Sequence, residues 1–97
     1  MKFVNHARYA ADAGKIAATR PAHRDYLGTL LASGQLLLAG PFTDDSGALF
    51  VYEAETLEAA RALVAADPFA QAGVFEHCDI KPWKLVFSAP TELVPAG

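Results

Sequence analysis

Apolar residues recur along the chain with two different periods, which predict a mixture of strands and helices. In KFVNHARY, residues 2–9, Phe3, Ala7 and Tyr9 fall on one side of an alternating pattern, together with Asn5. Alternation with a period of two is typical of a β-strand. The segment is therefore predicted to be a strand that is half buried or buried on both sides.

The first helix is predicted to begin near Pro21, because the missing N–H of proline has no partner in the first turn of a helix. Apolar residues then recur at helical spacing, namely Tyr26, Leu27, Leu30 and Leu31. Gly34 is expected to end this helix in a left-handed conformation. The preceding segment AADAGKIAAT, residues 10–19, contains Gly14 and many small residues and is expected to be a connecting loop.

The rest of the chain reads as two strands, a helix and a final strand. The predicted segments are, in order, a strand over 35–42, a turn of about five residues over 43–47, a strand over 48–54, a helix over 56–67, a turn or short helical turn over 67–73, a long strand over 73–87 and a tail over 88–97. Thr56 is the expected N-cap of the second helix. The long strand is expected to break at Pro82, and the tail either is loosely ordered or packs on a partner.

The order β-α-β-β-α-β predicts an α+β, ferredoxin-like fold in a single domain over 1–97, with its core over about 2–87. Right-handed crossovers give an antiparallel sheet in the order 4-1-3-2 with both helices on one face. The predicted strands carry apolar residues on both sides, as in Leu36–Leu37–Leu38. We therefore expect the face without helices to be covered by a second copy of the chain.

Charge and composition exclude several classes of function. The net charge is −3, and the eight Lys and Arg residues are scattered, so no basic stripe is available for nucleic acid. No apolar run reaches the roughly 20 residues of a membrane span. Cys78 is the single cysteine and is expected to be a buried thiol. These features are typical of a cytoplasmic protein that binds neither nucleic acid nor membrane.

The topology brings two ionisable side chains to one edge of the sheet. His23 lies on the inner face of the first predicted helix, and Asp67 continues the inner row of the second. An Asp that accepts a hydrogen bond from a His fixes the tautomer of the imidazole, as in a general base. Asp67–Pro68 is equally typical of an N-cap followed by proline. The spacing alone thus leaves a functional pair and a cap-and-core arrangement open.

Weaker candidates lie at the same edge. Arg8 and Arg20 could bind a carboxylate or be solvated, and Gly40–Pro41 could let a ligand approach the backbone or simply end a strand. A metal site would need the histidines together with Asp67, but no short ligand spacing supports it. The sequence contains no phosphate-binding glycine loop or dinucleotide motif, so we expect no cofactor.

Two segments resemble the YCII-related (YciI-like) family. The first is RPAHRDYLGTLLASGQLLLAGPF, and the second is ADPFAQAGVFEHCDIKPWK. The resemblance implies the dimeric α/β-barrel superfamily, in which two ferredoxin-like sheets pack face to face. It also implies a pocket in which His23 and Asp67 form a pair with Arg20, Gly40, Pro41 and Phe69 nearby.

The leading functional hypothesis is therefore a small-molecule enzyme without a cofactor. His23 would be the general acid/base, Asp67 would orient it, and the substrate would be a compact anionic or phenolic molecule that undergoes isomerisation or elimination. The alternatives are a metabolite-binding or regulatory module that performs no chemistry, and a structural domain in which His23 and Asp67 are core and cap residues.

Overall fold

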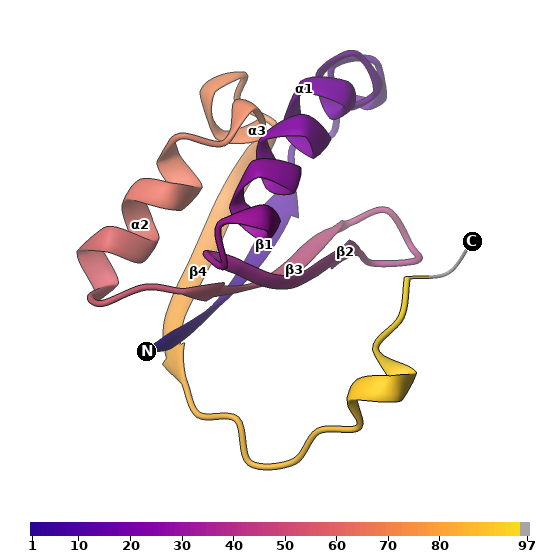
Figure 1. The fold of residues 1–97 in the computed structure, drawn as a ribbon. Helices are drawn as coiled ribbons and strands as arrows, with labels where there is room; N and C mark the ends of the chain where they lie inside the picture. Colours follow the sequence, from indigo (N-terminus) through magenta and orange to yellow (C-terminus); the bar gives the residue numbers. More distant parts are fainter. Residues whose placement is uncertain (96–97) are drawn as a thin grey trace.

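Four antiparallel strands form one sheet, and the helices cover one side of it (Figure 1). The computed structural model describes residues 1–95. Its elements are, in order, β1 (Lys2–Tyr9), α1 (Ala13–Ala32), β2 (Leu36–Pro41), β3 (Gly47–Glu53), α2 (Leu57–Ala65), α3 (Pro68–Gln71), β4 (Phe75–Trp83) and the 3₁₀ turn η1 (Pro90–Glu92). The sheet order β2-β3-β1-β4 is the predicted order 4-1-3-2 read from the other edge, so the ferredoxin-like prediction is confirmed.

The first helix begins earlier than its sequence predicts. Residues 13–19 belong to α1, where a connecting loop was expected, and Pro21 lies inside the helix. The side chain of Asp12 caps the helix by accepting a hydrogen bond of 3.0 Å from the Lys15 N–H. Pro21 lacks an N–H and so removes one backbone hydrogen bond, and the cap together with the alanines before Pro21 outweighs that loss. No helix within residues 1–95 is long and apolar enough to cross a membrane.

The final strand is shorter than predicted. β4 begins at Phe75 rather than at residue 73, and it ends at Trp83 rather than at residue 87. It also passes through Pro82 without the expected break, since Pro82 pairs with Phe3 of β1. β4 is an edge strand, so the position that lacks an N–H can face away from the sheet at no cost in ladder hydrogen bonds.

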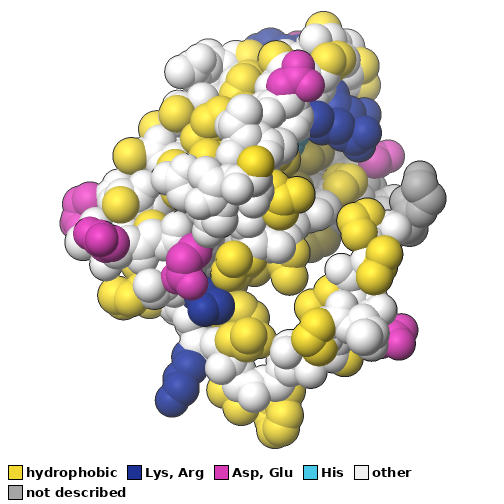
Figure 2. Space-filling model, in the orientation of Figure 1, with side chains coloured by type: hydrophobic (Ala, Val, Ile, Leu, Met, Phe, Trp, Pro, Cys, Tyr) yellow, Lys and Arg dark blue, Asp and Glu magenta, His cyan; other side chains and the backbone are white. Residues whose placement is uncertain are grey.

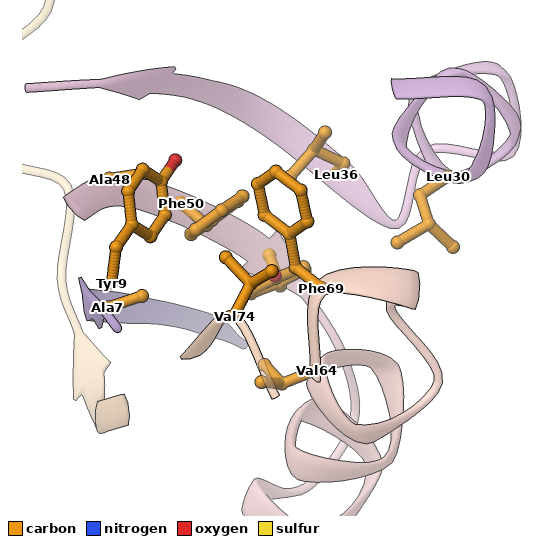
Figure 3. Close-up of a cluster of buried hydrophobic side chains, with 10 residues drawn as sticks. Ala7, Tyr9, Leu30, Leu36, Ala48, Phe50, Val64, Phe69 and Val74 are labelled. Atoms are coloured by element: carbon orange, nitrogen blue, oxygen red, sulfur yellow. The ribbon is translucent and has the colours of Figure 1, made fainter. Parts of the chain in front are cut away.

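The core lies between the sheet and the helices. Along β1 the side chains of Phe3, Asn5, Ala7 and Tyr9 are buried on the helix side, as the alternation predicts. Figure 3 shows Phe50 of β3, Phe69 of α3 and Val74 directed toward one another in this core. Phe69 is 1% exposed although α3 has only four residues, so this short helix is held by the packing of one aromatic ring.

The opposite face of the sheet carries no helix. Val4 pairs with Val51, which in turn pairs with Leu38, so the three side chains lie on that face beside Leu49. On β4 the same face carries Asp79 and Lys81, whose charged groups are 3.4 Å apart. The open face is therefore apolar along β2 and β3 and charged along β4.

The C-terminal segment (residues 84–95) leaves the sheet after β4 and arches away from it (Figure 1). Figure 2 shows an opening between this segment and the body of the molecule. Its apolar side chains are exposed, and Phe87 reaches 91%. The predicted tail over 88–97 is described only to residue 95, and residues 96–97 lie outside the described range.

The β1–β3 pairing contains one position where only glycine fits. A Cβ added at Gly47 would lie 1.9 Å from the carbonyl oxygen of Ala7, whereas a Cβ at Gly28 of α1 would meet nothing within 4 Å. We expect Gly47→Ala to destabilise the fold by about 1–3 kcal/mol because the strands must separate. Gly28→Ala is the matched control and should stabilise the helix by about 0.5–1 kcal/mol.

Urea denaturation of the two variants checks this expectation. An unchanged midpoint for Gly47→Ala would contradict the close approach of β1 and β3 at this position.

Candidate functional site

A buried hydrogen bond joins α1 to the start of α3. The Nδ1 atom of His23 lies 2.6 Å from Oδ1 of Asp67, across 44 residues of sequence. The His23 residue is 6% exposed and Asp67 is fully buried. A buried ionisable pair is costly unless its members satisfy each other, so this contact fixes the position of both side chains.

Asp67 performs two tasks at once. Its Oδ1 atom also accepts a hydrogen bond of 2.9 Å from the Phe69 N–H, which makes Asp67 the N-cap of α3, and Pro68 follows it in the first turn. The cap and the His–Asp pair, which sequence alone presents as alternatives, coexist in one carboxylate. Asp67 itself lies just after α2, whose C-cap is Ala66, rather than inside that helix.

The hydrogen bond determines the tautomer of His23. An ionised carboxylate can only accept hydrogen bonds, so Nδ1 of His23 carries the proton that is donated to Asp67. In the neutral imidazole Nε2 then has a free lone pair. Nε2 forms no hydrogen bond with residues 1–95, and His23 is one of the residues that line a pocket at this edge of the sheet. The site therefore presents a proton acceptor to whatever occupies that pocket.

Aromatic rings enclose the imidazole. Phe69 stacks on it with ring centroids 3.7 Å apart and an interplanar angle of 6°. Phe50 and Phe75 meet it edge-on, at 5.9 Å and 6.3 Å. These contacts hold the ring in one orientation and keep water away from its faces, so that only the Nε2 edge is available for chemistry.

The pocket beside His23 has a volume of about 1010 Å³. Its walls come from the end of β1, from α1, β2, β3 and α3, and from the C-terminal segment, and the opening seen in Figure 2 contributes to its size. Most of the wall is apolar, from Leu27, Leu31, Leu36, Leu38, Phe42 and Phe50. An apolar pocket with a few polar groups is typical of a site for a small organic molecule.

Two arginines give this pocket a positive end. Arg20 and Arg24 lie one turn apart on α1 and both line the pocket, and neither forms an ion pair with a residue in the described part of the chain. Figure 2 shows Lys and Arg side chains gathered at this edge of the molecule. A guanidinium can bind a carboxylate with two parallel hydrogen bonds, and it can donate a charge-assisted hydrogen bond to a phenolate oxygen. The pocket thus suits an anion.

Tyr9 adds a hydroxyl to the same wall. Burial raises the pKa of Tyr9, while the nearby guanidinium groups of Arg20 and Arg24 act in the opposite direction and Asp67 raises it. The phenol remains protonated at neutral pH and is available as a hydrogen-bond donor. Its ring meets Phe69 edge-on at 5.6 Å, which places it next to the ring that stacks on His23.

Most of the predicted site residues meet in this pocket. Arg20, His23, Gly40, Pro41 and Phe69 line it, and Asp67 lies directly behind His23. Arg8 does not line it. Alternation along β1 turns Arg8 to the open face, where it forms an exposed ion pair of 3.1 Å with Glu76.

Sequence reasoning did not assign Arg24 or Tyr9 to the site, although both line the pocket. Arg24 could have been found because it lies one helical turn after Arg20. Tyr9 could have been found from its place on the buried face at the end of β1. No group of three or more His, Cys, Asp or Glu side chains within residues 1–95 could hold a metal ion.

Comparisons with known proteins agree with this geometry. The family model for the YCII-related domain matches residues 1–84. Protein YciI of Escherichia coli O6:H1 is 42% identical over 98 residues, which cover 90% of this chain and 100% of that protein. The uncharacterized protein YjpA of Bacillus subtilis is 41% identical over 63 residues, which cover 65% of this chain and 73% of that protein.

A solved structure shares the fold. The 5-chloro-2-hydroxyhydroquinone dehydrochlorinase TftG from Burkholderia phenoliruptrix AC1100, in complex with 2,5-dihydroxybenzoquinone, superposes with a TM-score of 0.76 and 28% sequence identity. The match covers 87% of this chain and 94% of TftG. The sequence matches, above all the family model over residues 1–84, establish that the chain belongs to the YCII-related family.

Proposed function

We propose that this chain is a small-molecule enzyme in which His23 is the general acid/base and Asp67 orients it. The observation that carries the proposal is the hydrogen bond of 2.6 Å at Nδ1, which leaves Nε2 as the free nitrogen of an imidazole that lines the pocket. An imidazole held in one tautomer by a buried carboxylate is well suited to removing a proton and returning it.

The proposed substrate is a compact phenolic or enolic anion. Its apolar ring would lie against the Leu and Phe side chains of the pocket, and its anionic oxygens would face Arg20 and Arg24. The likeness to TftG supports this class, because that protein is a dehydrochlorinase bound to a dihydroxybenzoquinone.

One base and no cofactor suffice for isomerisation or elimination. Nε2 of His23 would take a proton from the substrate, and the electron pair of the broken bond would form a new double bond. In an elimination the leaving group departs with its own electron pair, so that a proton and an anion are lost overall. In an isomerisation the same nitrogen returns the proton to a different atom of the substrate.

Replacement of the pair separates chemistry from folding. With 5-chloro-2-hydroxyhydroquinone as the test substrate, we expect His23→Gln to lower kcat by roughly 10²–10⁴-fold because the proton acceptor is lost. We expect Asp67→Asn to lower kcat because it removes the carboxylate that orients His23. The thermal unfolding midpoint should change little, because an Asn side chain can still cap α3. Chloride release measures turnover, and His77→Gln, which replaces an exposed histidine of β4, is the control.

Full turnover by His23→Gln would contradict the proposal. If the wild-type chain binds the compound and releases it unchanged, the pocket belongs to a binding module without chemistry.

The proposed assembly is a homodimer formed through the open face of the sheet. The face is apolar along β2 and β3, and the C-terminal segment beside it exposes Val86, Phe87, Leu93 and Val94. Exposed apolar groups of this extent on two adjacent surfaces are typical of an interface rather than of a monomer.

Sedimentation equilibrium tests the assembly. We expect a dimer at micromolar concentration and expect Leu49→Glu to yield a folded monomer, because it places a charge within the apolar half of the open face. Ala62→Glu, on the exposed side of α2, should leave the dimer intact. A wild-type chain that sediments as a monomer would contradict packing through the sheet.

A further inference from the structure

Three polar atoms are buried on the core side of Asp67 without a hydrogen-bond partner among the described residues. They are Oδ2 of Asp67, the hydroxyl of Tyr52 and Oδ1 of Asn5. All three residues are fully buried. An unpaired buried polar atom destabilises the fold, and an unpaired carboxylate oxygen does so more strongly, so we looked for a partner that the three atoms could share.

The three side chains belong to one region of the core. Asn5 and Tyr52 both point from the sheet toward the helices, and the Asn5 amide lies 3.7 Å from the sulfur of Cys78. Tyr52 stacks on Phe50 at 5.9 Å, and Phe50 in turn meets His23 edge-on. Phe50 therefore links this region to the imidazole of the pair.

Electrostatics connect this region to Asp67. Burial raises the pKa of the Tyr52 hydroxyl, the charge of Asp67 raises it further, and the neighbouring Asn5 amide acts in the opposite direction. Burial also raises the pKa of the Cys78 thiol, the Asn5 amide opposes this, and Asp67 again adds to it. Tyr52 consequently keeps its proton at any working pH and is a hydrogen-bond donor.

The inventory of donors and acceptors indicates what the partner is. Tyr52 offers one O–H donor that has no acceptor, and Asp67 and Asn5 each offer an oxygen that has no donor. A water molecule has two O–H donors and accepts hydrogen bonds through its oxygen, so one water carries the donors and the acceptor that the three atoms need. A direct bond from Tyr52 could satisfy only one of the two oxygens.

We propose that one internal water molecule binds between Tyr52, Asn5 and Asp67, and that Tyr52 and Asn5 are positioning residues for the His23–Asp67 pair. With Oδ1 held by His23 and the Phe69 N–H, and Oδ2 held by the water, the carboxylate cannot rotate. The imidazole then stays in the tautomer whose Nε2 accepts a proton. The positioning role rests on the proposed function, whereas the water site itself does not.

Tyr52→Phe tests the inference with little change in volume. Tyr26→Phe is the matched control, because it also removes a tyrosine hydroxyl, in this case a partly buried one that donates to the backbone oxygen of Leu63 at 2.6 Å. NMR detects the internal water by its cross-relaxation with buried amide protons, and the ¹⁵N shifts of His23 report its tautomer.

We expect Tyr52→Phe to lose the water signal, to populate the second His23 tautomer and to lower kcat by roughly three- to tenfold with little change in KM. Tyr26→Phe should alter none of these readouts. Asn5→Leu provides a second variant that removes a different oxygen, and it should weaken the same water signal.

An unchanged water signal and unchanged His23 shifts in Tyr52→Phe would overturn the inference. The outcome is separable from that of the proposed function. If the water signal is present but His23→Gln keeps full turnover, the proposed enzyme is refuted and the water site stands. If the water signal is absent but His23 is essential for turnover, the water site is refuted and the proposed enzyme stands.

Discussion

The hydrogen bond between His23 and Asp67 is the constraint on which the site depends. It ties the middle of α1 to the junction of α2 and α3, and the same Asp67 oxygen starts α3 by accepting the Phe69 N–H. Phe69 then stacks on the imidazole. His23, Asp67 and Phe69 thus fix one another's positions, and the fold cannot place the short helix α3 without also orienting His23.

The division of the molecule into two faces follows from the same arrangement. Helices pack on the side of the sheet that carries Phe3, Ala7 and Tyr9, and the site forms where that packing ends, at the edge of the sheet. The buried polar groups there lie together, as in the His–Asp pair. The open face, by contrast, is apolar along two strands and needs no catalytic group, which suits it to contact between copies.

Alternation and helical spacing were enough to predict the order of elements and the sheet topology, because Phe3, Tyr9, Leu30 and Gly34 each obey a short-range rule. The meeting of His23 with Asp67 also followed from topology. The start of α1 could not be predicted, since tertiary packing and the Asp12 cap outweigh the local preference of Pro21. The polar atoms of Asn5 and Tyr52 were beyond prediction, because only the packed core reveals which of them lack partners.

A crystal structure of the chain with 2,5-dihydroxybenzoquinone tests the central claim most directly. The account predicts that one oxygen of the ligand lies within hydrogen-bonding distance of His23 Nε2, that a second faces Arg20 or Arg24, and that the ring packs on the apolar wall. A ligand bound away from Nε2, or an imidazole turned away from Asp67 in the complex, would contradict it.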